Sequence, residues 1–449
     1  MIVCKFGGTS VGDTGAVRRL VDIIRARVNE QPAVVVSALS GVTDRLLQLA
    51  RLAEQRDRAG IDEAVDGLIR RHAAMAAELK TGDEVVTAIT KDAWQLRTRL
   101  LAVAGHRVTP RLLDSIAGRG ELWSAWLVTA ALAHGGVNAT WVDARHIVIT
   151  DNRFTRATPD IGKLGAKARS IIPPLLAKGL VPVTQGFVGA TTSGFPTTLG
   201  RGGSDFTAAL LGAALSARRV EIWTDVNGIM TADPRVVPGA RTLAMASYDE
   251  AAELATFGAK VLHPATQLPL VEAGIPIVVL NSREPEHPGT TIAPDAELLR
   301  VGNSPVRCIS WKKNITVINI RAPRMLGTFG FLRAMFEVFE RHEVVVDVLA
   351  SSEISISLTI EDRSRLEDVV RDLSALGDVW VEENRAIIAV VGIGIRNTPG
   401  LAGRIFASVA PTNVEVISQG ASEINLTFVV RGEDAPGVVR RLHQEFFGI

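Results

Sequence analysis

Two glycine-rich turns carry the charged side chains whose types and spacing could do chemistry. Lys5 precedes residues 7–10 (GGTS), and consecutive glycines let backbone N–H groups approach phosphate oxygens. Arg201 lies within residues 199–205 (LGRGGSD), where its planar guanidinium could bind a carboxylate or a phosphate. The first turn matches neither a Walker A loop nor a GxGxxG fingerprint. Alternatively, the first turn is a plain tight turn without a ligand. The alternative for the second is a flexible turn in which Ser204 or Asp205 caps the following helix.

Two further charged residues complete a set that suits phosphoryl transfer. Lys260 follows a late helix, and Glu121 begins a helix that otherwise carries no charge. For Glu121, a favourable contact with the helix dipole is an equally simple interpretation. Catalysis of phosphoryl transfer consists mainly of positioning and of charge neutralisation by lysine, arginine and Mg²⁺. The residue types therefore favour a site where two anions meet.

The elements that must position these residues alternate between strand and helix. Residues 2–6 predict a strand, apolar residues from 17 to 28 recur at helical spacing, and residues 33–38 predict a second strand. Residues 44–108 read as helical, since they contain no proline and many Leu, Ala, Arg and Glu. Such alternation predicts an open, mainly parallel sheet between helices. Further strands are predicted at 139–142, 181–187, 219–224 and 275–280.

The last third of the chain contains an internal repeat at an offset of 70 residues. Without gaps, Gly330 falls on Gly400, and residues 352–354 (SEI) fall on 422–424 (SEI). Each copy reads as strand, glycine-containing loop, helix, strand, turn and strand, which predicts two small α+β modules. Four prolines in residues 284–305 mark a plausible boundary before them.

Composition excludes several classes of protein. The 449 residues include 49 Lys and Arg against 48 Asp and Glu, so no bulk positive field exists for nucleic acid or a membrane surface. We find no secretory signal pattern and no continuous apolar run of about 20 residues. Cys4 and Cys308 stand far apart in the sequence, which argues against a disulfide scaffold. We therefore expect a cytoplasmic protein.

The ordered motifs resemble those of aspartate kinases over nearly the whole chain. They are residues 5–10 (KFGGTS), 40–43 (SGVT), 120–121 (GE), 185–187 (QGF), 198–205 (TLGRGGSD), 223–228 (WTDVNG), 232–235 (ADPR) and 257–264 (FGAKVLHP). The resemblance implies an amino-acid-kinase catalytic domain at 1–300, with 44–108 as a helical insertion. It also implies two ferredoxin-like ACT modules, one at 313–385 and one formed by 306–312 plus 386–449.

By this resemblance, the enzyme transfers the ATP γ-phosphoryl group to the β-carboxylate of L-aspartate, the first step of lysine, threonine and methionine biosynthesis. A carboxylate with a reference pKa of about 3.9 is already ionised at neutral pH, so the reaction needs no general base. Mg²⁺ would be bound mainly through the nucleotide phosphates, with no metal site made by the protein alone.

The resemblance also assigns a role to each candidate residue. Arg201 would bind a substrate carboxylate and Glu121 the α-ammonium group, with Thr43, Phe187 and Ser204 completing the pocket. The transferring group would be neutralised by two lysines that Asp205 orients, and the nucleotide would contact backbone amides and side chains. The two lysines are Lys5 and Lys260, and the backbone amides are those of Gly7 and Gly8. The side chains on the nucleotide side are Thr224, Asp225, Met230 and Arg235.

The first repeat resembles the effector site of lysine-inhibited aspartate kinases. Asp347 and Glu353 could pair with the cationic ends of L-lysine, and the alternative interpretation is that both are solvated charges at a sheet edge. The other residues implied are Met325, Thr328, Phe331, Leu332, Val346 and Ser352. We expect lysine to inhibit the enzyme, and the ACT modules to assemble a homodimer or a higher oligomer.

Two other functions compete with this interpretation. One is another carboxylate kinase of the same fold, acting on glutamate or N-acetylglutamate, although tandem ACT modules are unusual there. The other is a non-catalytic amino-acid sensor that retains the ACT pair. The presence of Lys5, Arg201, Asp205 and Lys260 argues against the sensor.

Overall fold

The computed structural model describes residues 1–448 apart from 258–263, 295–303 and 326–328. These residues form two compact units. The first consists of Met1–Ile229, Ala244–Tyr248 and Val261–Arg300, and the second of Met230–Leu243, Asp249–Lys260 and Val301–Ile449. Two segments within the predicted 1–300 domain thus pack with the C-terminal modules, and the predicted domain boundaries stay a prediction.

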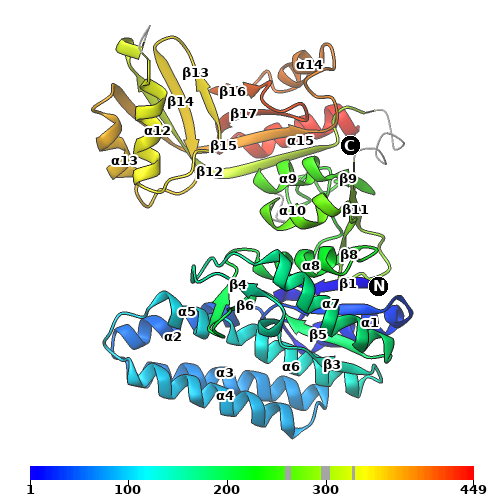
Figure 1. The fold of residues 1–449 in the computed structure, drawn as a ribbon. Coiled ribbons are helices and arrows are strands. Elements are labelled where there is room, and N and C mark those ends of the chain that lie inside the picture. The colour runs from blue at the N-terminus through cyan, green and yellow to red at the C-terminus, as the bar shows by residue number, and fades with distance from the viewer. Residues whose placement is uncertain (258–263, 295–303, 326–328, 449) are drawn as a thin grey trace. The chain divides into compact units, whose positions relative to one another are not determined.

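An eight-stranded sheet forms the centre of the first unit (Figure 1). Every neighbouring pair is parallel except β10 and β11, which confirms the predicted open, mainly parallel sheet. Its strands, in spatial order, are β3 (Ala139–Trp141), β5 (Val181–Gln185), β2 (Pro32–Val36), β1 (Ile2–Phe6), β8 (Val220–Thr224), β10 (Ile277–Asn281), β11 (Thr290–Ala293) and β9 (Met245–Ser247).

Helices cover both faces of this sheet. On one face α1 and α6 pack against the strands, and α3 and α4 form an outer layer beyond α6 in Figure 1. On the other face α8 contacts β1 and β2, and α7 and α10 pack beside α8. The helices are α1 (Thr14–Arg27), α2 (Val42–Glu54), α3 (Arg58–Leu79), α4 (Asp83–Ala102), α5 (Pro110–Ala117), α6 (Arg119–His134), α7 (Ile161–Ala177), α8 (Gly203–Ala214) and α10 (Pro264–Ala273).

Short elements connect the main layers of the first unit. A three-stranded sheet consists of β4 (Ile149–Thr150), which precedes α7 in the chain, and of β6 (Val188–Thr191) and β7 (Pro196–Thr198), which lie between β5 and α8. Single turns of 3-10 helix are η1 (Gly8–Ser10), η2 (Val28–Glu30) and η3 (Ala144–His146). Helix α9 (Tyr248–Thr256) follows β9, and all of it except Tyr248 belongs to the second unit.

The second unit is built on one antiparallel sheet that both sequence repeats share. Each repeat supplies a long central strand, two shorter strands and two helices, which confirms the predicted pair of α+β modules. In spatial order the strands are β13 (Leu349–Ser351), β14 (Ser355–Ile360), β12 (Cys308–Arg321), β15 (Asp378–Val391), β17 (Asn425–Arg431) and β16 (Val416–Gln419). The helical elements are η4 (Pro323–Met325), α12 (Phe331–Arg341), α13 (Leu366–Leu373), α14 (Leu401–Ser408) and α15 (Ala435–Phe447).

Strand β12 contributes to two separate hydrophobic cores. Val306 lies just before the strand and Ile309 near its start, and both pack with side chains of α14 and α15. Ile318 and Ile320, near its end, pack instead with α12 and α13. The register shifts after Lys312, between these two halves. One strand therefore links the cores of both modules.

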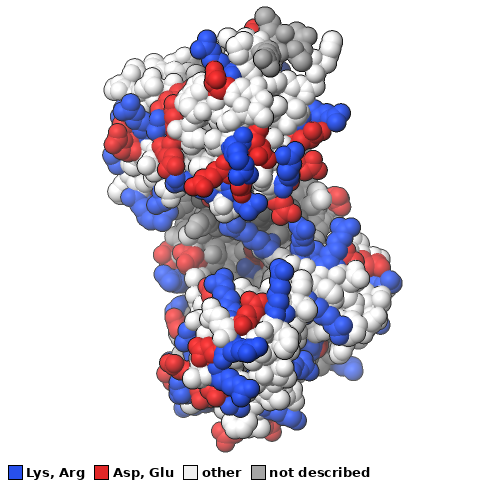
Figure 2. Space-filling view, turned by 90° about the vertical axis from the view of Figure 1, so that its left-hand side faces the viewer, with Lys and Arg blue, Asp and Glu red and all other residues white. Residues whose placement is uncertain are grey.

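Charged side chains of both signs are interspersed on the face shown in Figure 2. This mixture agrees with the formal net charge of +1. Among the described helices, none is both long enough and apolar enough to cross a lipid bilayer.

Candidate active site

A cavity of about 260 Å³ lies in the first unit, at the carboxyl ends of parallel strands β1, β2 and β5. Ligands of open α/β sheets usually bind at this edge. Its size is below the roughly 300–1,000 Å³ typical of drug-sized ligands, which suits a small metabolite. Seven residues predicted from the sequence line it together: Lys5, Thr43, Glu121, Phe187, Arg201, Ser204 and Asp205.

An ion pair between Lys5 and Asp205 forms one wall of this cavity. The Nζ atom of Lys5 lies 2.6 Å from a carboxylate oxygen of Asp205, and both side chains are largely buried. Lys5 points from the buried strand β1, whereas Asp205 lies in the first turn of α8. The pair holds an ammonium group in one orientation at the cavity.

The structure rules out the alternative interpretation of the second glycine-rich turn, in which Ser204 or Asp205 caps the helix, because α8 begins before both residues. Its N-terminal boundary residue is Gly202, and neither Ser204 nor Asp205 caps the helix with its side chain. Both lie inside the first turn instead, so their side chains are available to the cavity. The glycines let the chain turn sharply into the helix, with Gly202 at a φ of 73°.

Glu121 is a buried carboxylate with no cationic partner in the part of the chain that the structure describes. The residue is 5% exposed, and its Oε2 atom has no hydrogen-bond partner among the described residues. Burial raises the pKa of Glu121 to about 7, and hydrogen bonds from backbone N–H groups oppose this shift only in part. A ligand ammonium group would stabilise the charged form, so the carboxylate is suited to bind a cation.

Close backbone approaches bring Glu121 and Ser204 to the same cavity. A Cβ atom at Gly120 would lie 2.8 Å from the Cβ of Ala38, so only glycine lets α6 begin this close to the loop after β2. A Cβ atom at Gly186 would lie 2.6 Å from that of Ser204. Real side chains do not approach so closely, which explains the residue type at both positions.

Phe187 and Arg201 complete the lining. Phe187 adopts a φ of 68°, a left-handed conformation that costs energy in a bulky residue and often marks a functional site. Its backbone N–H donates to Oγ1 of Thr207, which helps to hold this conformation. Arg201 is exposed, and its side chain makes no hydrogen bond or ion pair within the described part of the chain. Its guanidinium is free to bind an anion.

The predicted nucleotide side begins where β1 and β8 end. The Gly7 N–H donates to the carbonyl of Trp223, whereas the Gly8 N–H makes no such bond among the described residues. Gly8 is therefore the better candidate donor to a phosphate. Thr224 ends β8 beside this turn, and its hydroxyl lies 3.3 Å from a carboxylate oxygen of Asp225.

The remaining nucleotide candidates belong to the second unit. The guanidinium of Arg235 pairs with Asp233, at 2.7 Å between Nη2 and Oδ2, and Met230 precedes it in the same segment. Lys260 lies outside the described residues. No cluster of three or more His, Cys, Asp or Glu side chains in the described ranges is arranged to hold a metal ion.

Comparison with known proteins identifies the family. Residues 1–281 match the amino acid kinase family, and residues 388–446 match the ACT domain. Lysine-sensitive aspartokinase 3 of Escherichia coli (strain K12) is 40% identical over 456 aligned residues, which cover 100% of this chain and 99% of that protein. The chain belongs to the aspartokinase family.

Two solved structures of E. coli aspartokinase III share the fold of this aspartokinase family member. One, in complex with aspartate and ADP in the R-state, has a TM-score of 0.85 and 38% identity, with 100% of both chains covered. The other, in complex with lysine and aspartate in the T-state, has a TM-score of 0.86 and 39% identity. It covers 100% of this chain and 99% of that one.

The pocket of this aspartokinase family member also contains a residue that the motifs did not indicate. Ser37 lines the cavity and is the first residue after the buried strand β2. Its N–H donates to the carbonyl of Phe6, which fixes its position beside β1. A polar residue directly after an all-apolar strand, at the carboxyl edge of a parallel sheet, is the signal that could have found it.

The candidate lysine site lies in the first ACT module of this family member. Asp347 precedes β13 and is partly buried, and its carboxylate lies 3.2 Å from the Nζ atom of Lys312 on β12. The same ammonium group lies 2.9 Å from Glu361. Burial raises the pKa of Asp347, and the charge of Lys312 opposes this effect.

The other effector candidates are spread around the same module. Met325 ends η4, and Phe331 and Leu332 begin α12. Val346 immediately precedes Asp347, Ser352 makes a turn with Ser355 between β13 and β14, and Glu353 is exposed. Thr328 lies outside the described residues.

Proposed function

We propose that this protein transfers the γ-phosphoryl group of ATP to the β-carboxylate of L-aspartate. The products are ADP and 4-phospho-L-aspartate, in the first step of lysine, threonine and methionine biosynthesis. The observation that carries the proposal is one cavity that combines an oriented ammonium group on Lys5 with the Glu121 carboxylate and the Arg201 guanidinium, neither of which has an ion-pair partner among the described residues. This set complements the carboxylates and the ammonium group of an acidic amino acid.

The cavity supplies binding and charge compensation, and the substrate supplies the nucleophile. Arg201 binds a carboxylate of aspartate, and Glu121 binds its α-ammonium group. Thr43, Phe187 and Ser204 fill the remaining wall. An oxygen of the β-carboxylate forms a bond to the γ-phosphorus while the bond from that phosphorus to the bridging oxygen of ADP breaks. No proton moves in this step, so no general base is required.

Positive charge must offset the repulsion between the two anionic reactants. Lys5 neutralises the transferring phosphoryl group, and Asp205 keeps its ammonium group in place. Lys260 provides a second cation. The nucleotide binds through backbone amides at the first glycine turn, chiefly that of Gly8, and along Thr224 and Asp225 at the end of β8. Mg²⁺ bound mainly through the nucleotide phosphates would supply further charge compensation.

Lysine inhibition is the finer part of the proposal. The E. coli relative is named lysine-sensitive, and one of its structures contains lysine and aspartate. In this chain Asp347 supplies a partly buried carboxylate for a ligand ammonium group, and Glu353 an exposed one. Lysine inhibits by binding one of two conformations more tightly than the other.

A homodimer formed through the ACT modules is part of the same proposal. Phe329, Leu332 and Phe336 expose large apolar side chains around the start of α12. Apolar side chains gathered in this way favour contact with another protein surface. Sedimentation of the full chain with and without lysine tests this, since a protein that stays monomeric under both conditions contradicts it.

Release of ADP with different acceptors tests the reaction. We expect turnover with aspartate but not with glutamate or N-acetylglutamate, and suppression by lysine rather than threonine. Turnover with one of the other acceptors would assign the chain to a different carboxylate kinase. No turnover with any acceptor, combined with tight lysine binding, would indicate an amino-acid sensor.

A further inference from the structure

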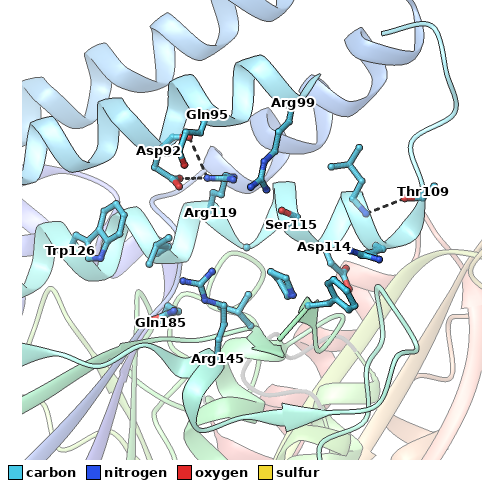
Figure 3. A pocket seen from close by; sticks show the side chains of 17 residues that line it. Asp92, Gln95, Arg99, Thr109, Asp114, Ser115, Arg119, Trp126, Arg145 and Gln185 are labelled. Atoms are coloured by element: carbon cyan, nitrogen blue, oxygen red, sulfur yellow. Dashed lines mark hydrogen bonds and ion pairs between the residues drawn. The ribbon is translucent and has the colours of Figure 1, made fainter. Parts of the chain in front are cut away.

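A second, larger cavity lies in the first unit and has no assigned role (Figure 3). Its volume is about 770 Å³. It shares no lining residue with the cavity of about 260 Å³ that Lys5, Glu121 and Arg201 line, which is called the aspartate cavity below. Its walls come from α4, the start and end of α5, the first half of α6, η3 and the hairpin of β6 and β7. None of the residues proposed above for catalysis lines it.

Charge in this cavity is unequal. Four arginines and two aspartates line it: Arg99, Arg111, Arg119, Arg145, Asp92 and Asp114. Both carboxylates are already engaged. Asp114 is 1% exposed and accepts hydrogen bonds from the backbone of Thr155 and Thr198 and from the Thr198 hydroxyl. Asp92 accepts from Arg119 and, at 2.8 Å, from Nε1 of Trp123.

The arginines, in contrast, keep unused donors. Arg119 is 8% exposed, and its Nε atom is buried without a hydrogen-bond partner among the described residues. Arg145 pairs with Asp143 through Nε and Nη2, which leaves Nη1 without a partner in the described ranges. The Arg99 side chain makes no hydrogen bond or ion pair within the described part of the chain.

These guanidinium groups converge on the same space. In Figure 3, Arg99 points into the cavity from α4 and Arg145 from the opposite wall, with Arg119 between them. Like charges repel in a partly buried site, so an anion among them would lower the energy of the whole group. Planar guanidinium groups also match the geometry of carboxylate and phosphate oxygens.

Apolar rings add surface for an organic ligand. Trp126 lines one end, and Phe195 lies beneath the guanidinium of Arg111, 3.4 Å from ring centre to Cζ. The volume is within the range of roughly 300–1,000 Å³ that suits small organic ligands. An inorganic ion alone would leave most of the space to water.

We infer that this cavity binds a small organic anion that carries a phosphate or carboxylate group. Arg99, Arg119 and Arg145 bind the anionic group, and the rings of Trp126 and Phe195 contact the remainder. The site is separate from the aspartate cavity and does not depend on the proposed reaction.

Titration calorimetry on the full chain tests this binding. The probes are inorganic phosphate and citrate, which represent the two anionic groups, and ethylamine serves as a cationic control. We expect one phosphate or citrate bound per chain and no ethylamine. Arg99→Gln should weaken the binding at least about tenfold, because it removes a charge-assisted contact. Arg70→Gln removes an exposed helical arginine outside the cavity and should change nothing.

Two further measurements locate the bound anion. Arg201→Gln should leave this binding unchanged, whereas binding that Arg201→Gln abolishes and Arg99→Gln spares would belong to the aspartate cavity and would overturn the inference. Hydrogen exchange with the probe present should show protection within α5 and at the start of α6. The absence of binding by both probes at millimolar concentration would also overturn it.

Discussion

Two carboxylates, one in each unit, are proposed to bind ligand ammonium groups, and they differ in whether a cation of the described residues already contacts them. Glu121 in the first unit has an oxygen with no partner among the described residues, and its pKa is raised to about 7. Asp347 in the second unit already contacts the ammonium group of Lys312, 35 positions earlier in the chain. The first site gains an ion pair when an amino acid binds, whereas the second exchanges one ion pair for another.

This difference has a consequence for affinity and for regulation. A carboxylate that waits unpaired contributes the whole of its new ion pair to substrate binding. A carboxylate that is already paired contributes only the difference between its internal and external partners. We therefore expect substrate binding to depend strongly on Glu121, and the sensitivity to lysine to be limited by Lys312.

The largest expected effect is that of Lys5, the cation that is paired with Asp205 and lines the same cavity as Glu121. Lys5→Ala should lower kcat by at least about 10³, because a preorganised charge at the transferring group disappears. Its circular dichroism spectrum should stay that of the native protein. Lys178→Ala, at an exposed helix end, is the control. Near-normal turnover in Lys5→Ala would remove this residue from the mechanism.

Glu121→Gln should raise the KM for aspartate about 10- to 100-fold, because it exchanges a charged acceptor for a neutral one. Steady-state kinetics with varied aspartate measure this. The substitution should also stabilise the fold at pH 8 by up to about 3 kcal/mol, since it removes the cost of holding a buried charge. A less stable variant with an unchanged KM would contradict the assignment of Glu121 to the substrate ammonium.

The pH dependence should follow the same group. The folded-state pKa of Glu121, at about 7, lies above its usual value of 4.5, so the folded protein holds this proton more tightly than the unfolded chain. The contribution to stability is therefore full below pH 4.5 and lost as the pH rises through 7. The KM for aspartate should rise up to about tenfold per pH unit below 7 and stay flat above it. A profile that Glu121→Gln does not flatten would assign the titration to another group.

Lys312→Gln should give the smallest effect, and it should strengthen the binding of a ligand instead of weakening it. Without the internal ammonium group, Asp347 becomes free for the ligand, and half-inhibition should need about three- to tenfold less lysine. Lys313→Gln changes the neighbouring exposed lysine and serves as the matched control. If Lys312→Gln needs more lysine, then Lys312 supports the effector site instead of competing with the effector.

The contrast between the two carboxylates also indicates what the sequence reveals. The buried strands and the glycine turns are local patterns, so the parallel sheet and the position of Lys5, Arg201 and Asp205 at one cavity followed from motif and topology. The unpaired state of Glu121 did not, because it depends on what packs around the start of α6. The Lys312–Asp347 pair joins distant residues across the sheet and leaves no local signal.

Other features escaped the sequence for the same reason. Ser37 was missed because it belongs to no motif, although its place after β2 puts it in the cavity. The arginines of the second cavity come from four separate elements, and only the tertiary fold brings them together. Conversely, a cap by Ser204 or Asp205 was the alternative interpretation of the second glycine-rich turn, but α8 starts at Gly203 and neither side chain caps it. The local pattern did not indicate that extra turn.

The central claim is that the protein phosphorylates a carboxylate of aspartate bound in the cavity of Lys5, Glu121 and Arg201. Trapping the acyl-phosphate product tests this claim most directly. The full chain is incubated with ATP, Mg²⁺, L-aspartate and hydroxylamine, and the hydroxamate formed from an acyl phosphate is measured beside ADP. We predict β-aspartyl hydroxamate in equal amount to ADP with the native chain, and none above background with Lys5→Ala. ADP released without hydroxamate, or equal hydroxamate from both proteins, would contradict the account.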